Sequence, residues 1–170
     1  LVPEFGDGGK VDLRVYADTT ELIDYNYTSP PLVVGDVVVV GQAMADHPLT
    51  KEQRPGYVRA YDVRTGERRW TWNPIPRAGE PGVETWLDDS WEYSGMGNVW
   101  TMMSADEELG LVYLPTGAPS NDMYGGHRPG NNLYANSLVC VRADTGEMVW
   151  YFQTVHHDLW DYDNNVAPIL

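Results

Sequence analysis

Residues 156–163 form the segment HHDLWDYD, in which polar and aromatic side chains are unusually dense for a surface loop. It holds three aspartates, Asp158, Asp161 and Asp163, and the carboxylate of Asp161 is a candidate for proton transfer, because a carboxylate can accept a hydroxyl proton during a reaction. Aspartates also cap turns through hydrogen bonds to nearby backbone N–H groups. The spacing alone favours this structural role for all three.

The neighbouring histidines His156 and His157 do not by themselves indicate a metal site. Adjacent residues of an extended chain point to opposite faces, so the two rings cannot easily bind one ion. We expect one histidine to orient Asp161 or a loop and the other to pack. Trp160 is likewise expected to pack rather than to contact a ligand.

The composition favours short strands joined by loops. The 170 residues include 17 Gly, 12 Pro, 7 Trp and 11 Tyr, which are turn formers and strand-forming aromatics. The net charge of −14 argues against nucleic acid and anionic membrane surfaces as partners, because both would repel the chain. A single cysteine, Cys140, excludes an internal disulfide and is expected to be a buried packing residue.

An internal repeat predicts two similar β-hairpins. YDVRTGERRW (residues 61–70) and VRADTGEMVW (residues 141–150) both contain Thr-Gly-Glu, with a tryptophan four residues after the glycine. Each follows a strand-like run, so a strand, tight turn and strand are expected. Gly66 and Gly146 would supply the positive φ angle that the turn requires. The tryptophans at the hairpin ends are expected to be wedges between neighbouring sheets.

A second hairpin precedes each copy, at residues 30–41 and 98–117. Four strands per repeat are typical of a propeller blade of about 40–50 residues. The sequence between the blades is too long and too rich in Pro and Gly for a turn, and long propeller loops commonly carry the site. Trp86 and Trp91 in this insertion are expected to pack. The expected division is a blade at about 29–73, a loop insertion at about 74–96, a blade at about 97–153 and the start of a further blade at 154–170.

The chain resembles the pyrroloquinoline quinone (PQQ)-dependent dehydrogenases, in particular the branch near quinoprotein glucose dehydrogenase. The resemblance runs almost end to end and rests on VPEFGDGGKVDL, TSPPLVVGDVVVVG, VRAYDVRTGERRW, NVWTMMSADEELGLVYLPTG, DMYGGHR and NSLVCVRADTGEMVWYFQTVHHDLWDYD. It implies an all-β fold of four-stranded antiparallel blades, as a fragment of an eight-bladed propeller. The chain matches about a third of such a domain, so we expect it to be part of a longer protein.

The resemblance assigns roles to residues far apart in the sequence. Asp161 matches the family's catalytic base, and Trp100 matches the tryptophan that forms the floor under the quinone ring. A flat tricyclic cofactor needs a flat apolar surface, and indole offers the largest one. Ser120 and His157 are expected near the cofactor as well. The alternatives are a turn cap for Asp161 and a core position for Trp100.

The family also implies a divalent cation, usually Ca²⁺, beside the quinone. Hard oxygen ligands are expected, and Asp46 and Asp122 are the candidates, while Ser120 is expected near both the metal and the cofactor. Other branches place an asparagine ligand where this chain has Ala118, and Asn121 or Asp122 would compensate. A surface-turn role for Asp46, Ser120 and Asp122 stays open.

The resemblance thus implies PQQ-dependent oxidation of a sugar or alcohol in the bacterial periplasm, with membrane association in the full-length protein. Asp161 would take the proton, the quinone the hydride, and Ca²⁺ would act as Lewis acid. Electrons would pass to a respiratory quinone or a cytochrome. The alternative is a non-catalytic propeller scaffold or binding module. If the chain folds by itself, copies are expected to associate and complete a propeller ring, since open sheet edges invite pairing.

Overall fold

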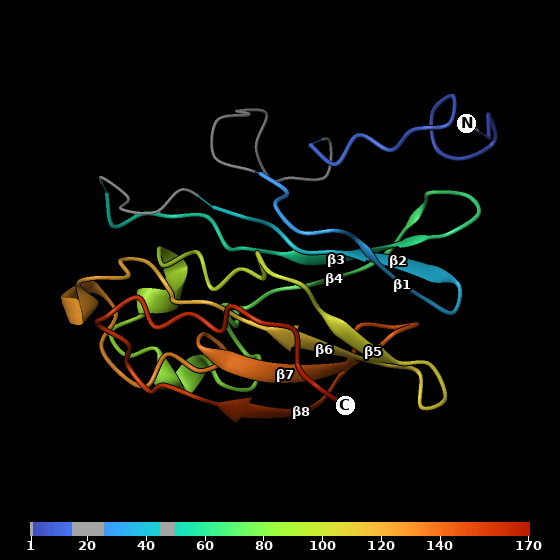
Figure 1. Cartoon of the computed structure of the whole chain (residues 1–170). Helices are drawn as coiled ribbons and strands as arrows, with labels where there is room; N and C mark the ends of the chain where they lie inside the picture. The colour runs from blue at the N-terminus through green and yellow to red at the C-terminus, as the bar shows by residue number, and fades with distance from the viewer. Residues whose placement is uncertain (1, 15–25, 45–49) are drawn as a thin grey trace.

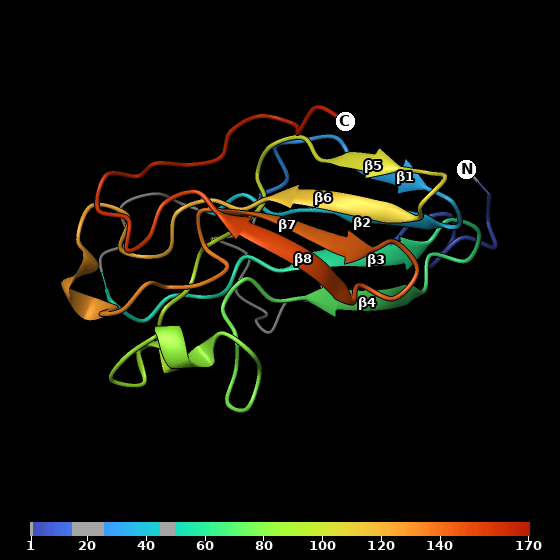
Figure 2. The same ribbon diagram turned by 90° about the horizontal axis from the view of Figure 1, so that it is seen from below.

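The computed structural model describes residues 2–14, 26–44 and 50–170, which form two four-stranded antiparallel sheets stacked face to face (Figure 1, Figure 2). In both sheets the strands lie side by side in chain order. The first sheet contains β1 (Leu32–Val34), β2 (Val37–Val40), β3 (Val58–Asp62) and β4 (Arg68–Trp72), and the second contains β5 (Ser104–Asp106), β6 (Leu111–Pro115), β7 (Ser137–Arg142) and β8 (Met148–Gln153). Three short 3-10 helices, η1 (Val83–Thr85), η2 (Ser90–Glu92) and η3 (Gly125–His127), lie in the described loops.

The sequence repeat corresponds to matching details of the two sheets. The β3–β4 register shifts between Ala60 and Tyr61, and the β7–β8 register shifts at the equivalent point after Cys140. Gly66 and Gly146 adopt φ angles of 74° and 73°, which confirms the predicted turns. Both sheets fall inside the residue ranges expected for the two blades, whereas the exact blade limits stay a prediction.

The core lies between the sheets because each strand turns alternate side chains inward. Along β2, Val37 and Val39 are buried and their neighbours are partly exposed. Cys140 is also fully buried, and burial raises the pKa of its thiol, as expected for a packing residue. The buried side chains of the core come from both sheets and include Val34, Val37, Val39, Val58, Ala60, Val112, Leu114, Val139 and Val141.

The two repeat tryptophans differ in their surroundings. Trp70 is 8% exposed, and its indole Nε1 donates a hydrogen bond to the Ala143 carbonyl oxygen of the second sheet at 2.9 Å. It therefore acts as the predicted wedge. Trp150 is 41% exposed on β8, with Tyr113 as its ring neighbour at 5.9 Å. No third sheet is present among the described residues to cover that face, so the wedge role of Trp150 stays a prediction.

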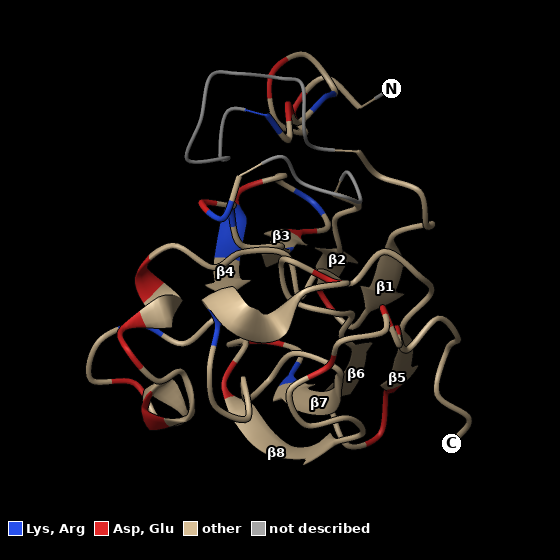
Figure 3. Cartoon of the chain, turned by 90° about the vertical axis from the view of Figure 1, so that its left-hand side faces the viewer, with Lys and Arg blue, Asp and Glu red and all other residues tan. Residues whose placement is uncertain are grey.

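The insertion between the sheets packs through its tryptophans, as predicted. Trp86 is buried against Ile75 and Ala135, Trp91 packs on the same cluster, and the Trp86 indole donates to the Leu133 carbonyl at 3.0 Å. Acidic residues line the exposed side of η1 and η2 (Figure 3). The insertion is thus a folded loop that shares a small core with the loop between β6 and β7.

Residues 154–170 contain no strand and run back along the second sheet (Figure 2). Thr101 Oγ1 donates to the Asn165 carbonyl at 3.0 Å, and Ser104 Oγ donates to the Pro168 carbonyl at 2.5 Å. These contacts return the end of the chain to β5. Whether this segment opens a further blade stays a prediction. Within the described ranges, no helix has the length and apolar character needed to cross a bilayer.

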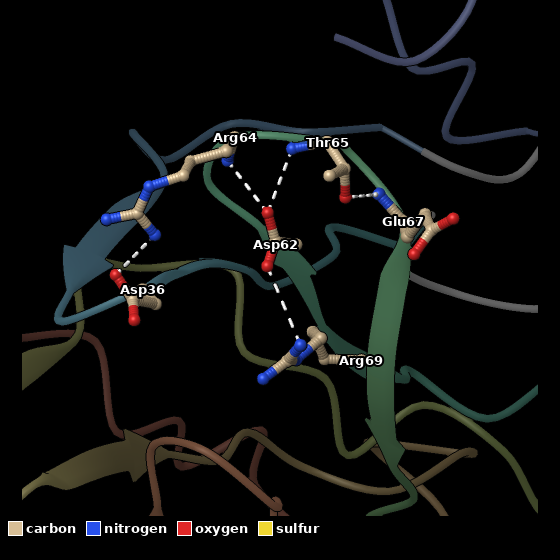
Figure 4. A network of polar contacts seen from close by, with 6 residues as sticks. All are labelled: Asp36, Asp62, Arg64, Thr65, Glu67 and Arg69. Atoms are coloured by element: carbon tan, nitrogen blue, oxygen red, sulfur yellow. Dashed lines mark hydrogen bonds and ion pairs between the residues drawn. The ribbon is translucent and has the colours of Figure 1, made fainter.

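The turn between β3 and β4 is organised by Asp62 (Figure 4). Its Oδ1 accepts hydrogen bonds from the backbone N–H groups of Thr65 at 2.8 Å and Arg64 at 2.9 Å, and Oδ2 lies 3.6 Å from Arg69. The two backbone bonds, aided by the charge of Arg69, lower the pKa of Asp62 below its ordinary value of 3.8. The ionised carboxylate is therefore the form that the turn stabilises.

We expect this turn to lose stability in acid. Because the pKa of Asp62 is lower in the folded than in the unfolded protein, its contribution is fully present above the unfolded value of 3.8. That contribution is lost as the pH falls through the folded pKa. A carboxyl-carbon NMR titration should place the Asp62 pKa below 3.8, and an equal or higher measured value would contradict the turn geometry.

Candidate functional site

Loops at one end of the sheets enclose a cavity of about 300 Å³. In an antiparallel meander alternate strands run in the same direction, so the loops after β2, β4, β6 and β8 meet at one end (Figure 1). Trp100 and Asp161, which are distant in the sequence, both line this cavity. The full lining consists of Thr28, Ala43, Met44, Met96, Asn98, Trp100, Ala118, Asp161 and Asp163.

Backbone hydrogen bonds hold the cavity walls together. Gly97 N–H donates to the Ala118 carbonyl at 2.9 Å, and Gly117 N–H donates to the Asn98 carbonyl at 3.0 Å. The Asn98 side-chain amide donates to the Gln42 carbonyl at 3.0 Å and so joins the first sheet to this pair of segments. The cavity is therefore built on a fixed backbone frame.

Asp158 shapes the loop that carries Asp161. Its side chain is almost fully buried, and its two carboxylate oxygens accept the backbone N–H groups of Trp160 at 3.1 Å and Tyr162 at 2.7 Å. Asn136 Nδ2 donates to the same carboxylate at 3.2 Å. Asp161 lies between the two capped N–H groups with a φ of 54°, a conformation that non-glycine residues seldom adopt. The expected turn cap is thus Asp158, and it presents Asp161 to the cavity.

We predict that Asp158→Asn lowers the free energy of unfolding by about 1–3 kcal/mol. An asparagine has one acceptor oxygen, and its amide N–H groups would face the N–H donors that the carboxylate now accepts. Urea denaturation of the full-length protein measures the change. The exposed Asp144→Asn is the matched control for loss of one negative charge. Equal denaturation midpoints for the two variants would contradict the capping role.

Arg128 connects the cavity loops from behind. It is fully buried, and its guanidinium donates to the carbonyls of Ser120 at 3.1 Å, Asn121 at 2.8 Å and Asp158 at 2.5 Å, and to Asn132 Oδ1 at 2.9 Å. Burial lowers the pKa of Arg128 to about 10, and the nearby carboxylates of Asp158 and Asp122 oppose this shift. The guanidinium therefore stays charged at neutral pH and ties the loop after β6 to the loop after β8.

One of the two adjacent histidines fixes a loop, as predicted. His157 Nδ1 lies 2.9 Å from the Gly130 carbonyl oxygen, and its backbone N–H donates to Asn131, so it fixes a loop. A Cβ atom at Gly125 would lie 2.7 Å from His157 Nε2, which explains the glycine there. His156 is exposed and Trp160 is 80% exposed. Packing was expected for both; no element of the described residues covers either side chain, so that expectation stays a prediction.

Three other predicted site residues, Ser120, Asp122 and His157, lie outside the cavity lining. Ser120 is buried, and its Oγ accepts the Gly95 N–H at 3.0 Å, so it supports the cavity segment 95–97 from behind. Asp122 is buried near Arg128, and His157 lies in the loop contacts described above. Asp46 lies outside the residues that the structure describes. Within the described ranges, no group of three or more His, Cys, Asp or Glu side chains is placed to hold a metal ion.

Two residues are more prominent in the geometry than sequence reasoning indicated: Arg128, which had no predicted role, and Asp163, which was expected only to cap a turn. Arg128 belongs to the DMYGGHR segment, where a lone arginine among glycines has the donors needed to bind several loop carbonyls. Asp163 follows Asp161 by two residues and accepts a hydrogen bond from the Trp100 indole at 2.7 Å. The cavity thus combines a flat indole, a carboxylate able to accept a proton, and a second carboxylate bonded to the indole.

Comparison with known proteins gives one family over the whole chain. Residues 1–170 match the model described as PQQ glucose/ethanol/alcohol dehydrogenase, beta-propeller domain. Quinoprotein glucose dehydrogenase A from Acinetobacter calcoaceticus is 36% identical over 168 residues, which cover 98% of this chain and 20% of that protein. The chain thus spans about one fifth of the length of such curated relatives.

Two solved structures share the fold. A quinohemoprotein alcohol dehydrogenase from Pseudomonas putida aligns with a TM-score of 0.70 and 36% identity, over 82% of this chain and 22% of that one. A europium-containing methanol dehydrogenase aligns with a TM-score of 0.68 and 30% identity, over 82% of this chain and 26% of that one. The two stacked sheets are therefore blades of a β-propeller.

Proposed function

Because the chain belongs to the β-propeller family of PQQ-dependent glucose, ethanol and alcohol dehydrogenases, we propose that its full-length protein oxidises a sugar or an alcohol with PQQ. The observation that carries the proposal is the shared cavity of Trp100 and Asp161, which the fold brings together from two different loops. A proton acceptor beside a flat aromatic surface is the arrangement that this oxidation needs. Glucose is the substrate named for several relatives.

The cavity fits a planar cofactor in size and chemistry. Its volume of about 300 Å³ is at the lower end of the range for small-molecule sites, and the Trp100 indole supplies a flat face for a ring system. Asn98, Asp161 and Asp163 add polar groups to the same lining.

The chain's own part in the reaction is proton removal and positioning. PQQ, when bound, supplies the two-electron oxidant that receives hydride from the substrate carbon. The Asp161 carboxylate accepts the proton of the substrate hydroxyl, since it lines the cavity and is held there by the Asp158 cap. Trp100 provides the surface against which the ring system lies. His157 and Ser120 hold the surrounding loops in place.

A divalent cation remains part of the proposal, with Ca²⁺ as the expected ion and Asp46 and Asp122 as expected ligands. The europium-containing structural relative supports a metal ion at the site, whereas its identity as Ca²⁺ comes from the family resemblance. The described residues do not form a cation site by themselves, since they contain no cluster of three suitable side chains and Asp122 does not line the cavity. The proton-transfer step therefore rests on Asp161 alone.

Electron acceptor and location follow from the same family. We expect a respiratory quinone or a cytochrome to take the electrons, and we expect the bacterial periplasm as the compartment, with membrane association of the full-length protein. The name of one relative, quinate/shikimate dehydrogenase (quinone), supports a quinone acceptor. The net charge of −14 supports a small-molecule substrate over nucleic acid.

Association of chains is expected only where residues 1–170 fold by themselves. The exposed edge strand β8 would then be the contact, because Val149, Trp150, Tyr151 and Phe152 are between 41% and 67% exposed along it. Large contiguous apolar patches mark interaction surfaces. Light scattering tests this, and a folded monomer would contradict it.

Reconstitution of the full-length apoprotein tests the proposed function against a non-catalytic scaffold. PQQ with Ca²⁺ should bind and produce dye-linked oxidation of a sugar or alcohol. PQQ without added metal and metal without PQQ are the controls. A folded protein that binds no PQQ and oxidises none of a panel of sugars and alcohols would favour the scaffold.

A further inference from the structure

Asp163 makes two hydrogen bonds at the cavity wall that involve different segments. Its Oδ2 accepts the Trp100 indole Nε1–H at 2.7 Å, and its Oδ1 accepts the Ala118 backbone N–H at 2.5 Å. Both acceptors belong to a carboxylate, and hydrogen bonds to charged acceptors are stronger than neutral ones. One side chain therefore joins the indole, the loop after β6 and the loop after β8.

The backbone beside Asp163 leaves room for this carboxylate. A Cβ atom at Gly117 would lie 2.6 Å from Asp163 Oδ1 and 3.3 Å from the Asn98 carbonyl oxygen. Cβ atoms essentially never come within 3.0 Å of a neighbouring atom, so any larger residue at 117 would displace the carboxylate. Gly117 is thus required by close approach, and the position of Asp163 depends on it.

The backbone of Trp100 is held by a residue from a third segment. Thr28 Oγ1 donates to the Trp100 carbonyl oxygen at 2.9 Å. The remaining freedom of the side chain is rotation about its two χ angles, and the bond from Nε1 to Asp163 removes it. An indole held at both its backbone and its ring nitrogen keeps one plane toward the cavity.

We propose that Asp163 is a positioning residue that fixes the plane of the Trp100 indole, so that this ring can receive the flat cofactor. The inference rests on the proposed function, in which Trp100 carries the ring system. It gives the two carboxylates of the cavity different roles. Asp161 acts on the substrate hydroxyl, whereas Asp163 acts through Trp100 and the turn at 117–118.

Asp163→Asn is the most selective variant. The asparagine has the same shape but one acceptor oxygen, so either the indole N–H or the Ala118 N–H would face an amide N–H. The readout is ¹⁹F NMR of the full-length apoprotein carrying 5-fluorotryptophan, with the Trp100 resonance assigned by Trp100→Phe. We expect this resonance to shift or broaden in Asp163→Asn and to stay unchanged in Asp144→Asn, which removes an exposed charge.

Cofactor affinity supplies the second readout. PQQ binding should weaken by about tenfold or more in Asp163→Asn, as expected for loss of a hydrogen bond to a charged group. In the Trp100→Phe background, which lacks the indole donor, the same substitution should have a much smaller effect. An equal weakening in both backgrounds would mean that Asp163 acts on the cofactor or an ion directly, and would overturn the proposal, as would an unchanged ¹⁹F resonance.

Two further results, a wild type that binds no PQQ and an Asp163→Asn variant that does not fold, can be told apart from those above. If the wild-type protein binds no PQQ, the proposed function fails, while the ¹⁹F spectra still decide whether Asp163 holds Trp100. If Asp163→Asn does not fold, the ultraviolet resonance Raman difference between wild type and Trp100→Phe isolates the signal of Trp100. That signal should show a strongly hydrogen-bonded indole N–H, and a weakly bonded one would overturn the proposal.

Discussion

Asp161→Asn is expected to lower kcat/KM for sugar or alcohol oxidation by about 100- to 10,000-fold, the usual contribution of a general base. The substitution keeps the shape of the side chain in the cavity and removes its ability to accept the hydroxyl proton. Because the Asp158 cap holds this loop through the backbone N–H groups of Trp160 and Tyr162, which the substitution leaves in place, the loop should keep its conformation. Steady-state kinetics of the PQQ-reconstituted full-length protein measures the effect.

The control for this variant is Asp144→Asn, which removes the same charge from an exposed turn between β7 and β8. Its kcat/KM should equal that of the wild type. The folded state of Asp161→Asn is checked by its circular dichroism and its denaturation midpoint. A loss of less than tenfold in the folded variant would remove Asp161 from the role of base.

Arg128→Met is expected to have the largest effect on stability, lowering the free energy of unfolding by about 3–5 kcal/mol. Methionine fills part of the space but leaves the carbonyls of Ser120, Asn121 and Asp158 and the Asn132 side chain without their buried donor. Each buried acceptor that loses its partner is costly. Urea denaturation of the full-length protein, monitored by tryptophan fluorescence, measures the change.

Two variants separate the hydrogen bonds of Arg128 from its charge. Arg128→Lys keeps a positive charge but lacks the planar fork with five donors, so an intermediate loss is expected. Arg64→Met removes an arginine whose side chain is 70% exposed and pairs with Asp36, and surface pairs of this kind contribute about 0–1 kcal/mol. Equal midpoints for Arg128→Met and Arg64→Met would contradict the bridging role of Arg128.

The sequence predicted the parts of the structure that depend on local pattern. The Thr-Gly repeats predicted the β3–β4 and β7–β8 hairpins and the positive φ of Gly66 and Gly146, because turn conformation depends on the turn residues themselves. The resemblance predicted Trp100 and Asp161 as parts of one site, and both line the same cavity. Their roles as cofactor floor and base stay predictions until activity is measured.

Properties that depend on distant neighbours were not predictable in the same way. Whether Trp70 and Trp150 are buried depends on which sheet lies beside each. The two copies of the Thr-Gly-Glu repeat therefore contain one buried and one exposed tryptophan. The bonds of Asp163 to Trp100 and Ala118 join three separate loops, and spacing along one segment carries no information on such contacts. The position of Asp122 also depends on such contacts. It was predicted as a metal ligand, but it lies near Arg128 and outside the cavity lining.

A crystal structure of the full-length protein with bound PQQ tests the central claim most directly. We predict that the quinone ring system lies flat on the Trp100 indole, with the Asp161 carboxylate at the edge where the substrate hydroxyl binds. A structure in which PQQ occupies another cavity, or in which these two side chains point into separate spaces, would contradict it.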